Sequence, residues 1–335
     1  MSEYRERIQE MLNGYRITQT LITCVELGIF EQLKNERASV SELGQSLNVD
    51  IAALTRLLNS ATALGLVERD GQYYHASPLA CACLVPEGSH YMGKQVKREA
   101  AFYRRWSHLT EAVRTGQRPT ENTTDEKDPN WVRNFELALL ETARINGPLV
   151  AKVLEPLLPQ RVEPPLRVID VGGGHGGYSI ALAEYFKGLQ AVVFELPAAA
   201  EVAREVIATA NREKQVSVQS GDFRVDSLGD NFDLVLLFGV LASETAVTAR
   251  NLLAEVYRAL VPGGIVAIRG FYLKPDGSGT VETTLIDLHL LLSSDSGKAH
   301  SVEEMIAWLQ EAGFQQPTTL ALPGQERDSL LVAQK

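Results

Sequence analysis

Residues 168–184, with the sequence VIDVGGGHGGYSIALAE, decide the fold because they join an apolar strand pattern to a glycine-rich turn and an apolar helix pattern. Gly172, Gly174 and Gly177 have the spacing G-x-G-x-x-G, which permits a tight turn and a close approach of a ligand to the backbone. The segment therefore predicts a ligand site at the carboxyl end of a parallel sheet. Several classes of nucleotide-like ligand use this spacing, so the glycines alone do not choose among them.

Five mostly apolar runs with amphipathic segments between them predict a doubly wound parallel sheet, an α/β fold of the Rossmann-like type. Strands that are buried on both faces have this composition, because helices cover each side of such a sheet. The runs are LRVIDV (166–171), QAVVFEL (190–196), QVSVQS (215–220), FDLVLLF (232–238) and GIVAIRGF (264–271). A turn at Pro262-Gly263-Gly264 is expected to lead into the last of them.

The front of the chain has a different, mainly helical pattern. Residues 1–35 are expected to be helical, and Ser41 and Asp50 are expected to cap the next two helices. The run LVERDGQYYHAS (66–77) predicts a hairpin, so the order helix, helix, hairpin is that of a winged helix. Its second helix offers only Arg56 as a basic side chain, whereas a DNA-recognition helix needs several donors. A core or dimer surface is favoured over DNA binding.

The length of 335 residues is natural for two domains. We expect a winged-helix-like dimerisation domain over 1–120, linking helices that contribute to an acceptor pocket over 121–160, and a ligand-binding domain over 161–335. A polar stretch at 117–130 and a proline-rich stretch at 159–165 indicate the loops at these boundaries.

Composition limits the partners. The chain is 45% hydrophobic and 22% charged, with a net charge of -10, which argues against nucleic acid or an anionic membrane as the partner. No apolar run is long enough for a membrane span. The three cysteines, Cys24, Cys81 and Cys83, are typical of free thiols in a reducing cytoplasm. No metal site is evident from ligand spacing.

Three details, together with the turn at Pro262-Gly263-Gly264, narrow the ligand to S-adenosylmethionine. Asp170 would repel a pyrophosphate but suits a ligand with an ammonium and a sulfonium, which disfavours a nicotinamide dehydrogenase. Glu195 ends the second strand and is placed to accept from ribose hydroxyls. After the third strand, Asp222 can accept from an adenine amino group while Phe223 covers the ring. The predicted cofactor-binding residues are Asp170, Gly172, Gly174, Glu195, Gly221, Asp222 and Phe223.

On these motifs the chain resembles the class I S-adenosylmethionine-dependent methyltransferases. The segments VIDVGGGHGGYSIALAE, FELP, GDF and LLAEVYRALVPGG carry that resemblance. The winged-helix front, the helix NFELALLETA and the ending SVEEMIAWLQEAGF are similar to the two-domain small-molecule O-methyltransferase family, over nearly the whole chain. The resemblance implies a homodimer joined through the N-terminal domains and a small-molecule acceptor.

Members of that family that methylate phenols have a histidine base after the fourth strand and two glutamates that flank it. Matching this pattern to VLASETA puts Ala242 at the histidine, with Gly270 and Ala299 at the glutamates. The chain resembles members that lack the base, such as phenazine N-methyltransferase and bacteriochlorophyllide C-methyltransferase. Alignment of donor and acceptor can supply much of the acceleration. We therefore expect transfer to nitrogen, carbon or an already acidic oxygen.

Other side chains are candidates for the pocket. His289 and Glu244 are the candidate catalytic groups, and His289 is also a candidate for acceptor binding. His300 begins a helix, so its function is less favoured than a capping or surface role. Tyr and Trp can stack on an aromatic acceptor, and Arg can pair with a carboxylate. The candidate substrate residues are Tyr103, Trp106, Arg144, Asn146 and His289.

Two other interpretations stay open from the sequence. One is a homologue that binds S-adenosylmethionine but catalyses cyclisation, decarboxylation or hydroxylation; formation of S-adenosylhomocysteine distinguishes the two. The other is a ligand-responsive transcription regulator, which the poor recognition helix and the negative charge disfavour.

Overall fold

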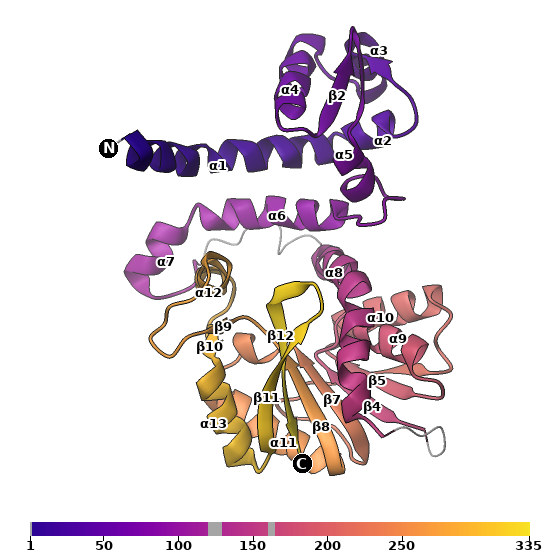
Figure 1. Cartoon of the computed structure of the whole chain (residues 1–335), viewed down its shortest axis with the longest axis vertical. Coiled ribbons are helices and arrows are strands. Elements are labelled where there is room, and N and C mark those ends of the chain that lie inside the picture. The colour runs from indigo at the N-terminus through magenta and orange to yellow at the C-terminus, as the bar shows by residue number, and fades with distance from the viewer. Residues whose placement is uncertain (1, 120–128, 160–164) are drawn as a thin grey trace. The chain divides into compact units, whose positions relative to one another are not determined.

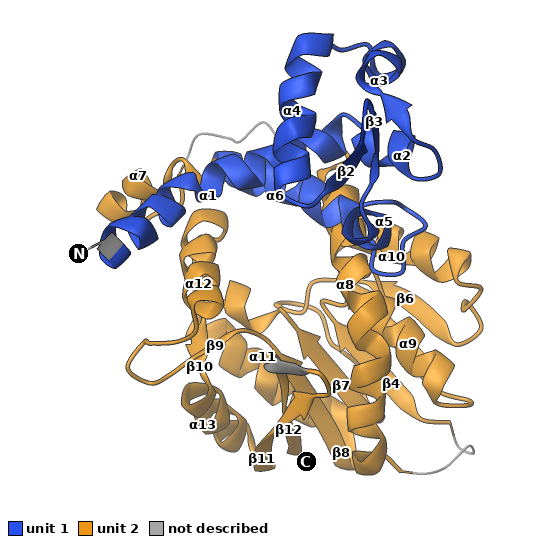
Figure 2. Ribbon diagram, turned by 45° about the horizontal axis from the view of Figure 1, so that its top comes forward, with its two compact units in different colours: residues 1–104 blue, residues 105–335 orange. Residues whose placement is uncertain are grey.

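The computed structural model describes residues 2–119, 129–159 and 165–335, and these form two compact units. Unit 1 is Met1–Arg104 and unit 2 is Arg105–Lys335, coloured separately in Figure 2. The predicted loop over 117–130 and the predicted linker over 159–165 fall mainly on residues outside the described ranges. The three-part division predicted from the sequence stays a prediction.

Unit 1 is mainly helical, with a small antiparallel sheet in the order β1-β3-β2. Its core contains Phe30 and Leu58, which come from two helices, and Tyr74, which comes from a strand. The order helix, helix, hairpin agrees with the predicted pattern, and the winged-helix assignment itself stays a prediction. The elements are α1 (Ser2–Glu26), α2 (Ile29–Leu33), β1 (Ala38–Ser39), α3 (Val40–Leu47), α4 (Ile51–Ala63), β2 (Val67–Asp70), β3 (Tyr73–Ala76), α5 (Pro78–Cys83) and α6 (Gly93–Trp106), whose end enters unit 2.

The caps of α3 and α4 show how local chemistry starts these helices. Asp50 accepts a hydrogen bond from the backbone N–H of Ala53 at 2.8 Å, which confirms it as the N-cap of α4. The prediction for α3 is wrong by two residues, because Ser39 and not Ser41 is the cap. Ser39 forms a capping box with Glu42, in which each side chain accepts from the other's backbone N–H.

Unit 2 is built on a seven-stranded sheet in the order β11-β12-β8-β7-β4-β5-β6. The neighbours from β8 to β6 are parallel, while β12 runs antiparallel to both β8 and β11 (Figure 1). The predicted Rossmann-like sheet is confirmed. The strands are β4 (Arg167–Val171), β5 (Gln190–Glu195), β6 (Val216–Ser220), β7 (Phe232–Phe238), β8 (Leu260–Arg269), β11 (Gln315–Leu322) and β12 (Gln325–Gln334).

Two expectations about this sheet need correction. The strand pair β11 and β12 was not predicted, because β11 carries no continuous apolar run and the run LLVA (330–333) of β12 is short. Pro262-Gly263-Gly264 lies inside β8, which begins at Leu260, although Gly263 has the left-handed φ of +79° that a turn residue has.

Both faces of the sheet are covered, and β7 shows how. Leu234 and Leu236 point into one apolar core, while Val235 and Leu237 point into the other. This is the alternation that a strand buried on both faces produces. The helices are α7 (Leu109–Thr115), α8 (Trp131–Leu154), α9 (Gly177–Tyr185), α10 (Pro197–Thr209), α11 (Ala246–Ala259), α12 (Val281–Ser293) and α13 (Val302–Ala312), with the short helices η2 (Glu155–Leu157) and η3 (Leu241–Ser243) and the strands β9 (Tyr272–Leu273) and β10 (His300–Ser301).

Among the described residues, none of the helices combines the length and the apolar character that crossing a bilayer requires. The three cysteines are free thiols, and Cys24 is buried.

Candidate active site

The glycine-rich turn after β4 has the geometry that its sequence predicts. Gly172 and Gly174 have φ angles of +66° and +50°, which only glycine adopts readily. The backbone N–H of Gly172 donates to the carbonyl of Phe194 at 2.8 Å, which ties the turn to β5. A Cβ atom at Gly172 would lie 2.5 Å from a methyl group of Val240. The turn therefore requires glycine at position 172, because a larger side chain would collide with Val240.

Asp170 lies at the end of β4 and is 1% exposed. Its Oδ2 accepts from the hydroxyl of Ser179 at 2.9 Å, while Oδ1 has no hydrogen-bond partner in the part of the chain that the structure describes. Burial raises the pKa of Asp170 to about 7, and the charge of Glu195 acts in the same direction. A buried, half-satisfied carboxyl group is the kind of side chain that a cationic ligand can complete.

Glu195 ends β5 beside this turn. Its Oε2 accepts from the backbone N–H of Gly174 at 3.0 Å, and its Oε1 accepts from the backbone N–H of Leu196 at 2.7 Å. Burial raises the pKa of Glu195, and these two N–H groups oppose the rise. Each oxygen retains a second lone pair, so the carboxylate can still accept from hydroxyl groups of a ligand.

Glu136 on α8 is a third carboxyl group at the same turn, and sequence reasoning missed it. It is 8% exposed, it packs directly against the space where Gly174 lacks a Cβ, and its Oε2 has no hydrogen-bond partner among the described residues. Burial, with the charge of Glu195, raises its pKa to about 8, while the backbone N–H of His175 acts the other way. The helix NFELALLETA was noticed in the sequence, but its pattern does not say which residue faces the turn.

His175 in the turn is structural. It is 5% exposed, and its Nδ1 accepts from the backbone N–H of Gly177 at 2.9 Å. Burial, with the charge of Arg144, lowers its pKa to about 4. It is therefore neutral near pH 7, and it orders the turn rather than adding charge to it.

The loop after β6 holds the predicted Gly221, Asp222 and Phe223. A Cβ atom at Gly221 would lie 2.5 Å from the ring of Phe194, so the close packing of β5 requires glycine there. Asp222 accepts from the backbone N–H of Arg224 at 3.0 Å, and Phe223 packs against one of the two cores of the sheet. Both side chains are partly exposed, which leaves them accessible to a ligand.

These groups fit S-adenosylmethionine. Two buried carboxyl oxygens without partners, on Asp170 and Glu136, suit the ammonium and sulfonium of that molecule. Glu195 suits ribose hydroxyls, and Asp222 with Phe223 suits an adenine ring. When bound, the molecule supplies the electrophilic methyl group.

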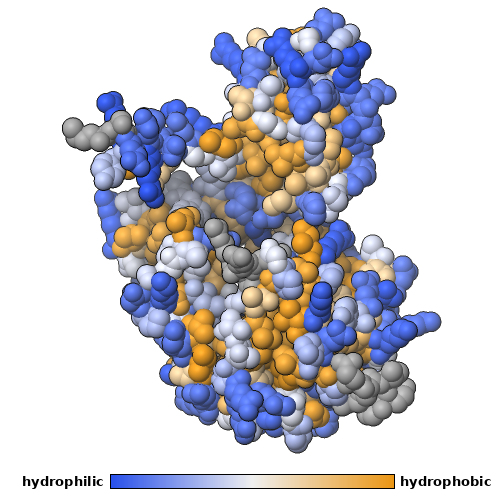
Figure 3. Space-filling model, in the orientation of Figure 1, coloured by the Kyte–Doolittle hydropathy of each residue, from blue (hydrophilic) through white to orange (hydrophobic). Residues whose placement is uncertain are grey.

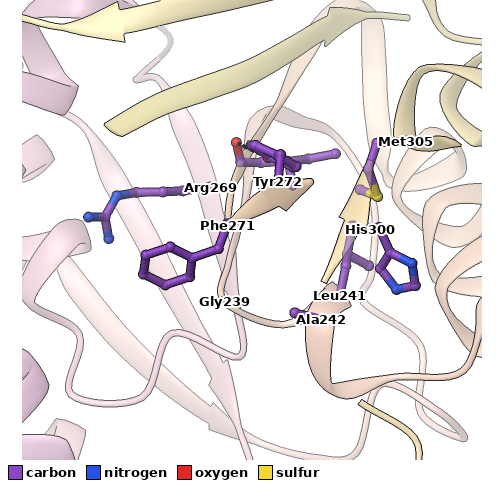
Figure 4. Close-up of a pocket in the computed structure, with 10 residues that line it drawn as sticks. Gly239, Leu241, Ala242, Arg269, Phe271, Tyr272, His300 and Met305 are labelled. Carbon is purple, nitrogen blue, oxygen red and sulfur yellow. Dashed lines mark hydrogen bonds between the residues drawn. The ribbon is translucent and has the colours of Figure 1, made fainter. Parts of the chain in front are cut away.

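A pocket beyond the end of the sheet contains two of the three positions that the family resemblance assigns to the usual catalytic residues. Ala242 and Gly270 line it, and Ala299 is buried immediately before the lining residue His300 (Figure 4). The pocket is partly open to solvent, and the space between its walls is about 280 Å³ when the adjoining open solvent is included. Its lining residues are Gly239, Leu241, Ala242, Ile268, Arg269, Gly270, Phe271, Tyr272, His300 and Met305.

His289 on α12 and Trp106 at the end of α6 are brought together. The indole Nε1–H of Trp106 donates to Nδ1 of His289 at 3.2 Å, and the rings lie 6.4 Å apart, 20° from parallel. Because an indole is only a donor, Nδ1 of His289 carries no proton in this arrangement, and the proton of the neutral ring is on Nε2. The pair was predicted as two separate candidates, and its roles stay a prediction.

Glu244 is engaged in a different contact from the one expected of a base. It is 6% exposed, and its two oxygens accept from Nε and Nη2 of Arg224 at 3.2 and 2.5 Å. This bidentate ion pair joins the loop after β6 to the turn that carries Ala242. The catalytic role of Glu244 stays a prediction. The ion pair argues against that role, because both oxygens of Glu244 already accept hydrogen bonds from Arg224.

The remaining substrate candidates are dispersed. Tyr103 packs against the core of unit 1. On α8, Arg144 is exposed and close enough to influence His175, while Asn146 is 3% exposed. No group of three or more potential metal-ligating side chains occurs within the described ranges.

The sheet order and the carboxylates around the glycine-rich turn define a class, that of the methyltransferases with a Rossmann-like sheet. Residues 106–315 match the O-methyltransferase domain and residues 9–86 match the O-methyltransferase dimerisation domain. The chain belongs to this O-methyltransferase family. The family membership confirms the predictions of a methyltransferase and of S-adenosylmethionine as its methyl donor.

Similar proteins span nearly the whole chain. A 3-hydroxy-5-methyl-1-naphthoate 3-O-methyltransferase of Streptomyces sahachiroi is 31% identical over 95% of this chain and 92% of its own length. The N,N-dimethyltransferase OxyT of Streptomyces rimosus is also 31% identical, over 97% and 95%. The structure of human N-acetylserotonin methyltransferase in complex with SAM is 24% identical and superposes with a TM-score of 0.87, over 100% of this chain and 98% of that one. That structure shows the similarity of the fold.

Proposed function

We propose that this enzyme transfers a methyl group to a small aromatic or polyketide-like acceptor of natural-product type, in a pocket without a histidine at the usual base position. Its relatives include enzymes named for a naphthoate and for tetracenomycin polyketide synthesis. The observation that carries the proposal is the pocket itself, which is lined by the small residues Ala242 and Gly270. We infer that these residues occupy the positions of ionisable residues in phenol-methylating relatives.

Small residues at these positions fit an acceptor that is held in line with the methyl group. Methyl transfer from a sulfonium is a displacement, and alignment of the two reactants supplies much of its acceleration. The relatives named here transfer to oxygen and to nitrogen. The acceptor atom is a nitrogen, a carbon or an acidic oxygen, and Trp106 and His289 remain candidates for contact with an aromatic ring.

The donor site consists of Asp170, Gly172, Gly174, Glu195, Gly221, Asp222 and Phe223, to which the structure adds Glu136. The left-handed backbone at Gly174 and the unpartnered oxygens of Asp170 and Glu136 support this assignment. The dimerisation-domain match supports a homodimer.

The first experiment is a native mass spectrum of the purified protein, followed by turnover with candidate phenols. A dimer that carries S-adenosylmethionine, and that releases S-adenosylhomocysteine together with a methylated acceptor, is the expected result. A protein that consumes the donor without methylating anything contradicts the proposal, because it indicates another reaction of the same cofactor.

A further inference from the structure

His300 forms β10, which pairs in parallel with β9, so that His300 lies opposite Tyr272. The segment before His300 is hydrogen-bonded to the turn that carries Ala242. The backbone N–H of Lys298 donates to the carbonyl of Ala242 at 3.0 Å, and the hydroxyl of Ser294 donates to the carbonyl of Ser243 at 3.3 Å. The sequence suggested only a helix start for His300, but these contacts place it in the same pocket as Ala242 and Gly270 (Figure 4).

The imidazole of His300 is buried, and its polar atoms are not satisfied. It is 3% exposed, and neither Nδ1 nor Nε2 has a hydrogen-bond partner among the described residues. The ring packs edge to face on Trp308, with centroids 4.8 Å apart and planes at 68°, which holds its orientation. Because buried polar groups in folded proteins nearly always have a partner, a ring held in this way in a pocket indicates a ligand that supplies one.

The charges around the ring come from three sides. Lys298 precedes it, Glu304 on α13 brings Oε2 to 3.9 Å from Nδ1, and Asp287 lies on α12. The backbone of Leu241 lies close enough to the ring to favour its protonated form. Burial and Lys298 lower the pKa of His300, against the opposing effects of Glu304, Leu241 and Asp287. The ring is consequently neutral near pH 7 and able to accept a proton.

We propose that His300 is the general base of this enzyme, and that it replaces, from β10, the histidine that is missing at Ala242. The proposal rests on the proposed function, and the acceptor class is a phenol or another hydroxyl that must lose its proton. The hydroxyl proton moves to a ring nitrogen of His300 while an oxygen lone pair forms the bond to the methyl carbon. The bond from that carbon to sulfur breaks with its electron pair on sulfur, and the imidazolium then gives its proton to water.

The test compares the wild-type enzyme with His300→Gln, using the phenol 3-hydroxy-5-methyl-1-naphthoate and N-acetylserotonin as acceptors. We expect kcat to fall about 100- to 10,000-fold, the usual contribution of a general base. The acidic limb of the wild-type pH profile, with a midpoint below the ordinary histidine pKa of 6.5, is expected to disappear. His108→Gln is the matched control, because this partly exposed histidine at the N-cap of α7 does not line the pocket and is expected to leave kcat and the profile unchanged.

A second variant keeps the proposal testable if His300→Gln disturbs the pocket. Adding Ala242→His to His300→Gln places an imidazole at the usual base position. We expect the kcat of this double variant to be at least about 10-fold higher than that of His300→Gln alone. In the wild-type background, Ala242→His is expected to give no increase. Binding of S-adenosylmethionine, measured by calorimetry, is expected to be the same in all variants.

Three results would overturn the inference. The first is a His300→Gln enzyme with wild-type kcat and an unchanged acidic limb. The second is a change confined to KM, which indicates a binding role only. The third is a wild-type enzyme that methylates acceptors without a proton to lose, such as a pyridine nitrogen, and no phenol. In each case methylation by the wild type still supports the proposed function, whereas failure to methylate any acceptor contradicts that function directly.

Discussion

At the scale of single residues, the ionisation of Asp170 is expected to make the binding of the cationic methyl donor depend on pH. Its pKa of about 7 means that the empty site holds a neutral acid at pH 6 and a carboxylate at higher pH. A cationic ligand favours the carboxylate, so the affinity for S-adenosylmethionine is expected to rise roughly 10-fold between pH 6 and 7.5. Calorimetry at several pH values measures this. Asp170→Asn is expected to bind more weakly and to flatten the dependence, and equal slopes for the two proteins would contradict the assignment.

Glu136 gives a prediction about stability. Its folded pKa of about 8 lies above the ordinary 4.5, so the ligand-free folded state binds this proton more tightly than the unfolded chain does. The contribution to the free energy of unfolding is therefore full at low pH and is lost as pH rises toward 8. Glu136→Gln carries no such proton, so its stability relative to wild type is expected to increase by on the order of 3 kcal/mol between pH 5 and 8.5.

Urea unfolding of the ligand-free protein at these two pH values measures the difference. Glu213→Gln, at an exposed glutamate, is the control and is expected to show no such change with pH. A constant difference between Glu136→Gln and wild type would show that Glu136 ionises normally in the folded protein.

At the scale of elements, the cap of α3 predicts different contributions to stability from Ser39 and Ser41. The hydroxyl of Ser39 accepts from the backbone N–H of Glu42, while Ser41 is exposed within the first turn. Ser39→Ala is expected to lower the free energy of unfolding by about 1 kcal/mol, and Ser41→Ala to change it by only a few tenths. Urea unfolding of both variants measures this, and equal losses would refute the capping assignment.

These elements also show what a sequence can and cannot predict. The strands β4 to β8 were predictable, because strands that are buried on both faces need continuous apolar runs, and these runs are evident in the amino-acid sequence. Ser39 was missed although its spacing to Glu42 is that of a capping box, whereas the third residue after Ser41 is Gly44, which has no side chain to complete the box. The strands β11 and β12 alternate polar and apolar residues less regularly, so periodicity gave no signal for them.

The candidate site was predictable to the extent that it follows from single motifs. Asp170, Gly174 and Glu195 lie next to strand ends, and parallel strands bring their carboxyl ends to one edge. Glu136 and His300 come from a helix and from a two-residue strand that approach the site only through tertiary packing. Their roles depend on which neighbours surround them, and no local pattern in the sequence contains that information.

At the scale of the whole molecule, the match of residues 9–86 to a dimerisation domain makes unit 1 the candidate surface for assembly. The helix α1 exposes large apolar side chains, namely Tyr4, Ile8, Met11, Leu12, Tyr15 and Ile17. Figure 3 shows apolar patches among hydrophilic residues on the face of unit 1 that it presents. An apolar helix surface of this kind in a region that matches a dimerisation domain favours burial against a second copy of the chain.

The role of α1 in assembly can be tested at exposed residues, without disturbing the core of unit 1. Ile8 and Met11 are 56% and 64% exposed and share one face of the helix, so charges there oppose association while the fold is retained. The double variant Ile8→Asp, Met11→Asp is expected to run as a monomer by native mass spectrometry at a concentration where the wild type is a dimer. Glu10→Lys, on the opposite face, is the matched control and is expected to stay dimeric. A double variant that remains fully dimeric would place the interface elsewhere on the chain, because two buried aspartates facing a partner cost more than an apolar helix contact contributes.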